Sequence, residues 1–380
     1  MFILASSSFS ELWHRFSWFR LRISYFFTIF VYYFLLVNDM RRSLFQNILW
    51  TLPAEVAHNI RMALLGVVGF IPSGKWWLRL CHAPQSKNLE REVFGIHFRN
   101  PVGLAAGFDP NGDRLEELAA TGFGFVEIGS VVPRPQPGTP RPRIKRLRSS
   151  NSLIDNSGYP CRGLEYILNN LRQRGSYARE LVIGCNIGHL TASHREDSVK
   201  EYLRVFRNMY QYVDFFVINI TCNTASKRFV LRNREEIQQL IEPLFEFRRG
   251  QLDYRPILLK ISPDLTKEEV DTIIDLLIET PLDGIEAVAG SIEMARKSPG
   301  AVTGALLTER AIEIVRYIAQ RTDHNYPIIG SGGMMKPEDI RRMMEAGASL
   351  VALNTGIREN GFRLLKKATE AIATIDNKED

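Results

Sequence analysis

The sequence predicts a (β/α)8 TIM barrel preceded by a small N-terminal helical extension. After Gly95, short apolar runs alternate with polar segments of helical period, as they do in consecutive βα units. Eight such units fit into roughly 270 residues, the number and the size that a (β/α)8 barrel needs. A doubly wound open sheet is the alternative, but no GxGxxG motif opens the first unit. We therefore expect a closed barrel over residues 91–380.

The expected strands are short, apolar and bounded by turn residues. They are residues 101–105, 125–129, 182–187, 215–220, 257–261, 285–288, 328–330 and 350–353. Helical periodicity between them predicts helices at residues 113–121, 197–210, 234–248, 266–279, 308–321 and 337–346.

The region before the barrel divides into two parts. Residues 41–90 carry apolar side chains at helical spacing, interrupted by a turn at 72–74, and predict two short amphipathic helices. These helices either pack on the barrel or enter a membrane interface. Residues 1–40 contain an uncharged, aromatic-rich run at 23–37 that is marginal for crossing a bilayer. The run is either an anchor with its flanking arginines on the cytoplasmic side, or it lies upstream of a true start at Met40.

Composition excludes several classes of function. A net charge of +6 is small for 380 residues and follows no helical stripe, so we expect no nucleic-acid partner. The four cysteines form no CxxC pair and the seven histidines show no ligand spacing, so we expect neither disulfides nor a metal site. Carboxylate pairs are absent from the predicted strand ends, which argues against glycosidase chemistry.

Small residues and amides dominate the strand ends, where a barrel carries its active site. The loops at 330–333 and 354–356 follow the last two strands, so we predict a phosphate site there.

Lys260, at the end of the fifth strand, is either a structural ion-paired lysine or a cation placed against an anionic flavin ring. Cys222, just past the fourth strand, is either an inert small hydrophobe or a general base or nucleophile.

Four motifs together resemble the dihydroorotate dehydrogenase family over roughly residues 42–370. They are NPVGLAAGFD at 100–109, GFGFVEIGSVVPRPQPG at 122–138, PIIGSGG at 327–333 and AGASLV at 346–351. A fifth motif, PAEVAH at 53–58, resembles the membrane-associated branch of the family, which has a two-helix extension and reduces a quinone.

The resemblance implies an FMN lying across the barrel mouth. The implied cofactor contacts are Ala105, Ala106, Gly107, Ser130, Asn186, Asn219, Lys260, Gly304, Gly332, Gly333, Asn354 and Thr355. The implied substrate contacts are Asn219, Asn223, Gly158 and Tyr159, and Cys222 would be the base that takes a proton from dihydroorotate while hydride passes to the flavin. The resemblance also implies that a quinone accepts the electrons of the reduced flavin. It places the reaction in pyrimidine biosynthesis and the protein at the cytoplasmic side of a membrane.

Several substrate-site positions depart from the family pattern. Pro110 stands where a lysine is usual, Asp155-Asn156 replaces an Asn-Arg pair, and Ala289-Gly290 replaces an Asn-Thr pair. Hydrogen bonds to charged groups contribute about 1.5–3 kcal/mol each, so dihydroorotate would bind far more weakly unless other residues compensate. Candidates for compensation are Arg162, His189 (where a lysine is usual) and Lys227.

The residue expected to act as general base also departs from the pattern of the quinone-using branch. That branch normally has serine at the position of Cys222.

Three functions remain open from the sequence. The first is a quinone-linked dihydroorotate dehydrogenase with an altered pocket. The others are a paralogous FMN oxidoreductase for a different, less anionic substrate, and a flavin-binding barrel without turnover.

Overall fold

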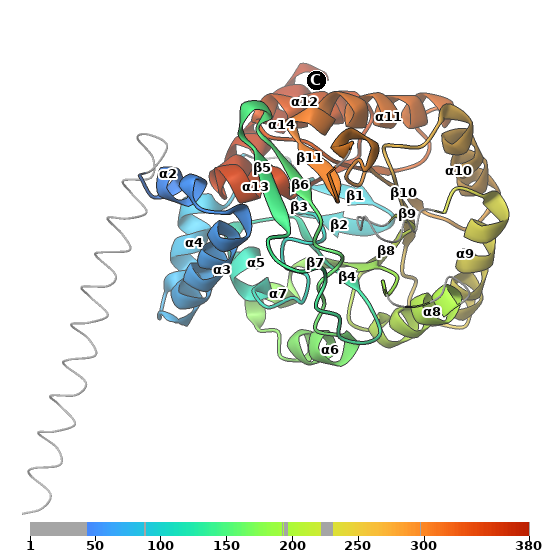
Figure 1. The fold of residues 1–380 in the computed structure, drawn as a ribbon, viewed down its shortest axis with the longest axis horizontal. Coiled ribbons are helices and arrows are strands. Elements are labelled where there is room, and N and C mark those ends of the chain that lie inside the picture. The colour runs from blue at the N-terminus through green and yellow to red at the C-terminus, as the bar shows by residue number, and fades with distance from the viewer. Residues whose placement is uncertain are drawn as a thin grey trace, which may run out of the picture.

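A computed structural model describes residues 44–86, 89–191, 193, 197–221, 231–296 and 298–379 of the chain. Its centre is a closed barrel of parallel strands in the order β10-β12-β13-β3-β4-β7-β8-β9 (Figure 1). These strands are β3 (Val102–Leu104), β4 (Phe125–Val131), β7 (Val182–Ile187), β8 (Phe215–Asn219), β9 (Ile257–Ile261), β10 (Gly284–Ala287), β12 (Ile328–Ser331) and β13 (Leu350–Leu353). The predicted (β/α)8 barrel is confirmed.

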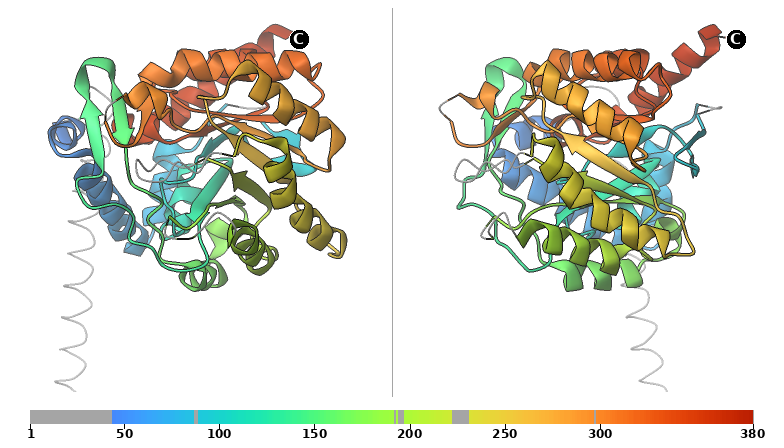
Figure 2. Two further views of the ribbon diagram at one scale, coloured as in Figure 1. Left: turned by 45° about the vertical axis from the view of Figure 1, so that its right-hand side comes forward. Right: turned by 90° about the vertical axis from the view of Figure 1, so that its right-hand side faces the viewer.

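Helices surround the barrel on its outer face (Figures 1 and 2). They are α5 (Leu115–Thr121), α6 (Leu164–Arg172), α7 (Ser176–Arg179), α8 (Ser198–Met209), α9 (Arg234–Arg249), α10 (Lys267–Glu279), α11 (Thr308–Arg321), α12 (Pro337–Glu345), α13 (Thr355–Asn360) and α14 (Arg363–Glu379). Side-chain caps fix two of their starts: Asn233 accepts from the backbone of Glu235, and Thr266 forms a capping box with Glu269. The six predicted helices are confirmed to within two residues, while α6, α7, α13 and α14 were not predicted.

The interior of the barrel is filled in layers. Alternate residues of each strand point inward, because successive side chains of a strand face opposite sides. At the amino end, the rings of Phe125 and Phe215 meet edge to face with centroids 5.9 Å apart. Gly103 and Gly184 on neighbouring strands make room for them, since a Cβ at either position would lie within 2.4 Å of a ring atom. This end of the barrel is therefore a packed apolar plug.

Two antiparallel elements, neither predicted, close the ends of the barrel. The hairpin β1 (Arg91–Val93) and β2 (Ile96–Phe98) covers the amino end, where Phe98 packs on Phe125 and Phe215. At the other end, β5 (Ile144–Leu147), β6 (Ser152–Asp155) and β11 (Ala301–Gly304) form a three-stranded sheet. This sheet stands over the carboxyl ends of the barrel strands, where sequence reasoning placed the site.

The N-terminal extension contains three described helices rather than the two predicted: α2 (Leu44–Thr51), α3 (Ala54–Phe70) and α4 (Gly74–His82). Pro53 separates α2 from α3, because a proline disfavours helical backbone in the residue before it. We find no described helix with the length and hydropathy of a membrane span. The predicted run at 23–37 and the choice between Met1 and Met40 lie outside the described residues.

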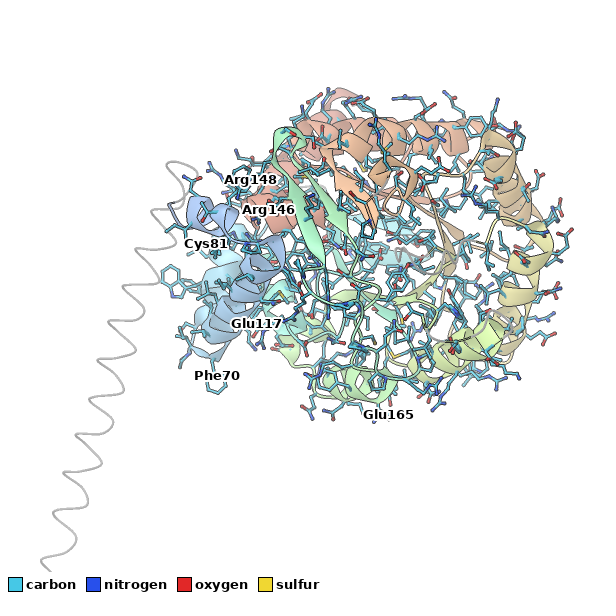
Figure 3. All side chains as sticks on the ribbon, in the orientation of Figure 1. Phe70, Cys81, Glu117, Arg146, Arg148 and Glu165 are labelled. Carbon is cyan, nitrogen blue, oxygen red and sulfur yellow. The ribbon has the colours of Figure 1, made fainter. Side chains whose placement is uncertain are left out.

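Arginines fasten the extension to the barrel. Arg146 of β5 donates to three carbonyls at the end of α2, those of Leu49, Trp50 and Leu52, and its Nε lies 2.8 Å from Glu359 Oε2 on α13. Arg146 lies beside α13 in Figure 3, where it is labelled. Arg61 of α3 donates to the Ile357 carbonyl at 3.2 Å. Because both side chains of the Arg146–Glu359 pair are only 9% exposed, water cannot replace either partner.

Replacement of Arg146 by alanine tests this docking. The change removes one partner of a buried ion pair together with the hydrogen bonds to the end of α2, and removing one partner of a buried pair costs about 3–5 kcal/mol. We expect a lower free energy of unfolding in a denaturant titration, together with faster proteolysis within residues 44–86. Arg341→Ala is the matched control, because Arg341 pairs with Glu338 and Glu345 on a solvent-exposed face of α12. Equal effects of the two changes would refute a special role for Arg146.

Candidate active site

A cavity of about 1210 Å³ opens at the carboxyl ends of the barrel strands. Strand-end residues form its floor, Leu153 and Thr303 of the β5–β6–β11 sheet contribute to its walls, and His58 and Met62 of α3 contribute from the extension. The cavity exceeds the roughly 300–1,000 Å³ of an ordinary small-molecule pocket. It therefore has room for more than one ligand, in a space that runs from the barrel axis to the extension.

Most of the predicted cofactor residues line this cavity. They are Ala105, Ala106, Gly107, Ser130, Asn219, Lys260, Gly332, Gly333, Asn354 and Thr355. Asn186 and Gly304 do not: Asn186 lies behind Ser130 as its hydrogen-bond acceptor, and Gly304 lies beneath Gly333. The predicted substrate residues Asn219, Gly158 and Tyr159 also line it. Cys222 and Asn223 lie outside the described residues, directly after Thr221, which lines the cavity.

Amides and hydroxyls from three neighbouring strands form one hydrogen-bonded group. Ser130 Oγ donates to Asn186 Oδ1 at 2.6 Å, and Asn219 Nδ2 donates to Ser130 Oγ at 3.2 Å. Thr221 donates to Asn219 Oδ1 through both its backbone N–H and its hydroxyl. Tyr159 donates from its hydroxyl to the Thr221 carbonyl at 2.5 Å and thereby joins the loop after β6 to the end of β8. The amide orientations are thus fixed by the protein itself.

The backbone of the loop after β12 lines the cavity at Gly332 and Gly333. Gly332 and Gly333 have φ angles of 97° and 79°, which favour glycine. A Cβ at Gly333 would lie 2.6 Å from the Thr308 nitrogen, so a larger residue does not fit. Beside them, Thr355 donates from its hydroxyl to Thr303 Oγ1 at 2.9 Å. Backbone N–H groups and hydroxyls converge here, which suits the phosphate predicted for these loops.

Lys260 forms an ion pair, as expected for the first of the two interpretations given for it in the sequence. Its Nζ lies 2.5 Å from Glu286 Oε1 on the adjacent strand. Burial by itself lowers the pKa of Lys260, but the negative charges of Glu286 and Glu127 outweigh it and the pKa is raised. Lys260 is therefore a charged ammonium at the cavity floor. Sequence reasoning missed Glu286 and Glu127, although an acid inside an apolar strand was a signal.

The positions that depart from the family pattern do face the cavity. Pro110, Asp155, Ala289 and Gly290 line it. The Asp155 carboxylate accepts from the Ser157 backbone at 2.8 Å and from the Ser157 hydroxyl at 2.5 Å, so its Oδ1 is already engaged. Five arginines also line the cavity: Arg114, Arg141, Arg143, Arg162 and Arg358. Cationic groups are thus present on its walls.

Three residues were expected to compensate for the departures at the substrate site, and the structure gives each a different position. Arg162 lines the cavity, and its guanidinium stacks 3.6 Å from the Tyr166 ring centroid. His189 instead pairs with Glu201, with Nδ1 3.3 Å from Oε2, behind the cavity wall. Lys227 lies outside the described residues. Arg358, which sequence reasoning missed, donates to Asn354 Oδ1 at 2.7 Å and to the Gly107 carbonyl.

His58 of α3 brings a buried imidazole to the cavity wall. Its Nε2 lies 2.9 Å from the Phe108 carbonyl, which can only accept, so Nε2 carries the proton. Burial, followed by the charges of Arg358 and Arg61, holds the pKa of His58 well below its usual value. The ring is therefore neutral, and Nδ1 is an acceptor without a partner among the described residues.

Known proteins resemble the chain over most of its length. A family model described as dihydroorotate dehydrogenase matches residues 88–375. The protein named dihydroorotate dehydrogenase (quinone) in Christiangramia forsetii is 34% identical over 339 residues, which are 88% of this chain and 98% of that protein. The one with the same name in Nitrosomonas eutropha is 32% identical over 351 residues, 88% of this chain and 98% of that protein.

Solved structures agree with this. The ligand-free DHODH from Eimeria tenella superposes with a TM-score of 0.76 at 26% identity, covering 86% of this chain and 95% of that one. The match of the family model over the whole barrel, together with relatives above 30% identity that the chain covers almost completely, leaves one conclusion. The chain belongs to the dihydroorotate dehydrogenase family.

Proposed function

We propose that this protein oxidises dihydroorotate to orotate in pyrimidine biosynthesis, with FMN as its flavin and a membrane quinone as electron acceptor. One observation carries the proposal: a single cavity joins the flavin-type floor of the barrel to helix α3 of the extension. FMN, when bound, takes two electrons from one substrate and gives them to another. The remaining chemistry has to come from side chains of this chain.

The residues present fit FMN. Glycines at Gly107, Gly332 and Gly333 leave room for a flat ring and for a phosphate to approach the backbone. Asn186 Nδ2 is buried without a partner among the described residues, so an amide donor is available next to Ser130. Lys260 would hold the pyrimidine side of the flavin ring, while Gly333, Asn354 and Thr355 would hold its phosphate.

Dihydroorotate would lie between the flavin and the segment that follows β8. Asn219 and Tyr159 line the cavity there and are fixed by the amide group described above. Cys222 comes one residue after Thr221 and would take the proton from the substrate carbon as general base. Arg162 is a wall cation that can offset the loss of the family lysine at Pro110.

The quinone would approach through the extension. His58, Asn59, Met62 and Ala63 of α3 line the cavity, as do Arg143 and Arg358. The acceptor atom His58 Nδ1 can receive a hydrogen bond from a hydroxyl of the reduced quinone. The Phe108 carbonyl holds the ring in this orientation.

The extension also offers a surface for a membrane. Large apolar side chains are exposed on α2, α3 and α4: Ile48, Trp50, Val56, Leu64, Val67, Phe70, Trp76 and Leu80. Phe70 is 94% exposed and projects from the end of α3 away from the barrel (Figure 3). Exposed apolar side chains on all three helices of the extension, two of them tryptophans, favour a membrane interface on the side from which a quinone would enter.

A different substrate is the second candidate function. Pro110, Asp155, Ala289 and Gly290 all line the cavity, so the departures from the family pattern alter the very surface that a substrate would touch. An uncharged analogue of dihydroorotate that is turned over faster than dihydroorotate itself would favour this candidate.

Cys222→Ala tests the proposed base. General base catalysis by a placed side chain contributes about 10²–10⁴-fold, so we expect orotate formation to fall by that factor while FMN content stays unchanged. Cys81→Ala is the control, because Cys81 is a cysteine of α4 that does not line the cavity. Unchanged turnover in Cys222→Ala would remove Cys222 from the mechanism.

His58→Ala tests the quinone path. Loss of one hydrogen bond and its packing predicts a KM for a soluble quinone about tenfold higher, with flavin reduction by dihydroorotate retained. Because the ring is already neutral, the quinone KM of the unchanged protein stays flat between about pH 6 and pH 8. His82→Ala is the control: His82 is a largely buried histidine of α4 that does not line the cavity. Similar KM changes in both variants would contradict the path.

Phe70→Ser tests membrane association. Burying a phenylalanine side chain contributes about 1.5–3 kcal/mol, so we expect binding to lipid vesicles to weaken tenfold or more in a chain begun at Met40. Leu252→Ser removes an equally exposed apolar side chain (106% exposed) beyond α9 and should leave vesicle binding unchanged. If the unchanged protein does not co-sediment with vesicles, the extension has another role.

A further inference from the structure

Three ionisable side chains meet inside the barrel, directly beneath the cavity. Lys260 of β9 and Glu286 of β10 are partners in the parallel register of these strands, so their side chains point inward at the same level. Glu127 comes from β4, which stands four strands from β10 in the closed order and thus on the opposite wall. The two glutamates are fully buried, and Lys260 is 8% exposed.

The charges of this group balance. The pKa of Glu127 lies well above its usual range because of burial and, next, the negative charge of Glu286. Its surroundings therefore favour the protonated form of Glu127. Lys260 and Glu286 remain as an ion pair with 2.5 Å between Nζ and Oε1. Within this pair the charges of Lys260 and Glu286 offset each other.

The ion pair is one-sided with respect to the cavity. Lys260 lines the cavity, whereas neither glutamate does. A ligand above Lys260 meets the cation first and the anion just behind it. Because both charges act through the same low-dielectric interior, the anion cancels much of the attraction that the cation alone would exert.

We propose that Glu286 is a positioning residue that sets the electron affinity of the flavin by acting through Lys260. It offsets the charge of Lys260 and makes the flavin harder to reduce than it would be above an unpaired lysine. The inference rests on the proposed function, in which FMN lies over Lys260. A flavin tuned in this way passes electrons more readily to the acceptor than one held over an isolated cation.

The test compares midpoint potentials of the bound flavin in two variants of the full chain. Glu127→Gln is the matched background, because it puts a neutral amide of the same shape at this position and prevents a carboxyl there from ionising in place of Glu286. Glu127→Gln/Glu286→Gln then removes only the anion behind Lys260. Potentials are measured anaerobically with a chemical reductant and indicator dyes, so that no turnover is needed.

We expect Glu127→Gln to stay within about threefold of the unchanged protein in the equilibrium constant of reduction. The double variant should favour reduction by roughly tenfold or more over Glu127→Gln, which for a two-electron couple is about 30 mV or more. A double variant within threefold of its background, or one that is harder to reduce, overturns the proposal.

If the Glu127→Gln/Glu286→Gln variant does not fold, a second variant tests the same proposal. Lys260→Met/Glu286→Met replaces the pair by apolar side chains, a change that is often neutral or stabilising for buried pairs. Its reduction equilibrium should lie within about threefold of the unchanged protein, because cation and anion leave together. A tenfold loss would mean that Lys260 acts as an unscreened cation and would overturn the proposal.

The outcomes separate the inference from the proposed function. A chain that binds FMN but is not reduced by dihydroorotate contradicts the proposed function alone, since the dye titration still measures the potential. A chain that holds no flavin refutes both.

Discussion

Every strand of the barrel turns alternate residues inward, and eight strands leave room inside only for those side chains. Water is absent from such an interior, so any charge placed there must find its partner within the barrel. The amino end satisfies this with the rings of Phe125 and Phe215. One level higher, Lys260 satisfies it with Glu286 from the adjacent strand. The ion pair allows an apolar core to end in a polar cavity floor.

The cavity wall also depends on polar contacts between distant parts of the chain. The extension completes the cavity through α3, and polar contacts hold it in place: Arg146 bonds the end of α2, Arg61 bonds the Ile357 carbonyl, and Arg114 bonds the Met62 carbonyl. These arginines come from both sides of the junction, so the position of α3 depends on the barrel and the barrel mouth depends on α3. An electron acceptor entering beside His58 would therefore meet a wall of fixed shape.

Much of the fold was predictable because the barrel strands are apolar runs bounded by turn residues, and their observed ends differ from the expected ones by one or two residues. The antiparallel strands were missed because three or four residues leave no clear periodicity, and because β1, β2 and β5 are also partly exposed. Pro53 was read as part of one helical segment, although it ends α2. Ten of the twelve predicted cofactor residues line the cavity, since strand ends of a barrel converge whatever their sequence.

The parts that sequence did not predict depend on pairing across the fold. Lys260 and Glu286 are 26 residues apart and become neighbours only through strand register. Asn186 was expected to contact the cofactor; its Oδ1 accepts a hydrogen bond from Ser130 and its side chain does not line the cavity, a placement that depends on the register of β4 and β7. The hydrogen bonds between Asp155 and Ser157 likewise form at the end of a strand in the sheet over the barrel mouth, which the sequence did not reveal.

We propose that dihydroorotate binds in this cavity despite Pro110, Asp155, Ala289 and Gly290. The most direct measurement is an anaerobic titration of the flavin-loaded protein with dihydroorotate, followed by the absorbance of the flavin. Bleaching at stoichiometric to modest excess concentrations, with orotate formed in equal amount, is the result that this account predicts. A flavin that a chemical reductant bleaches but dihydroorotate leaves oxidised would contradict it.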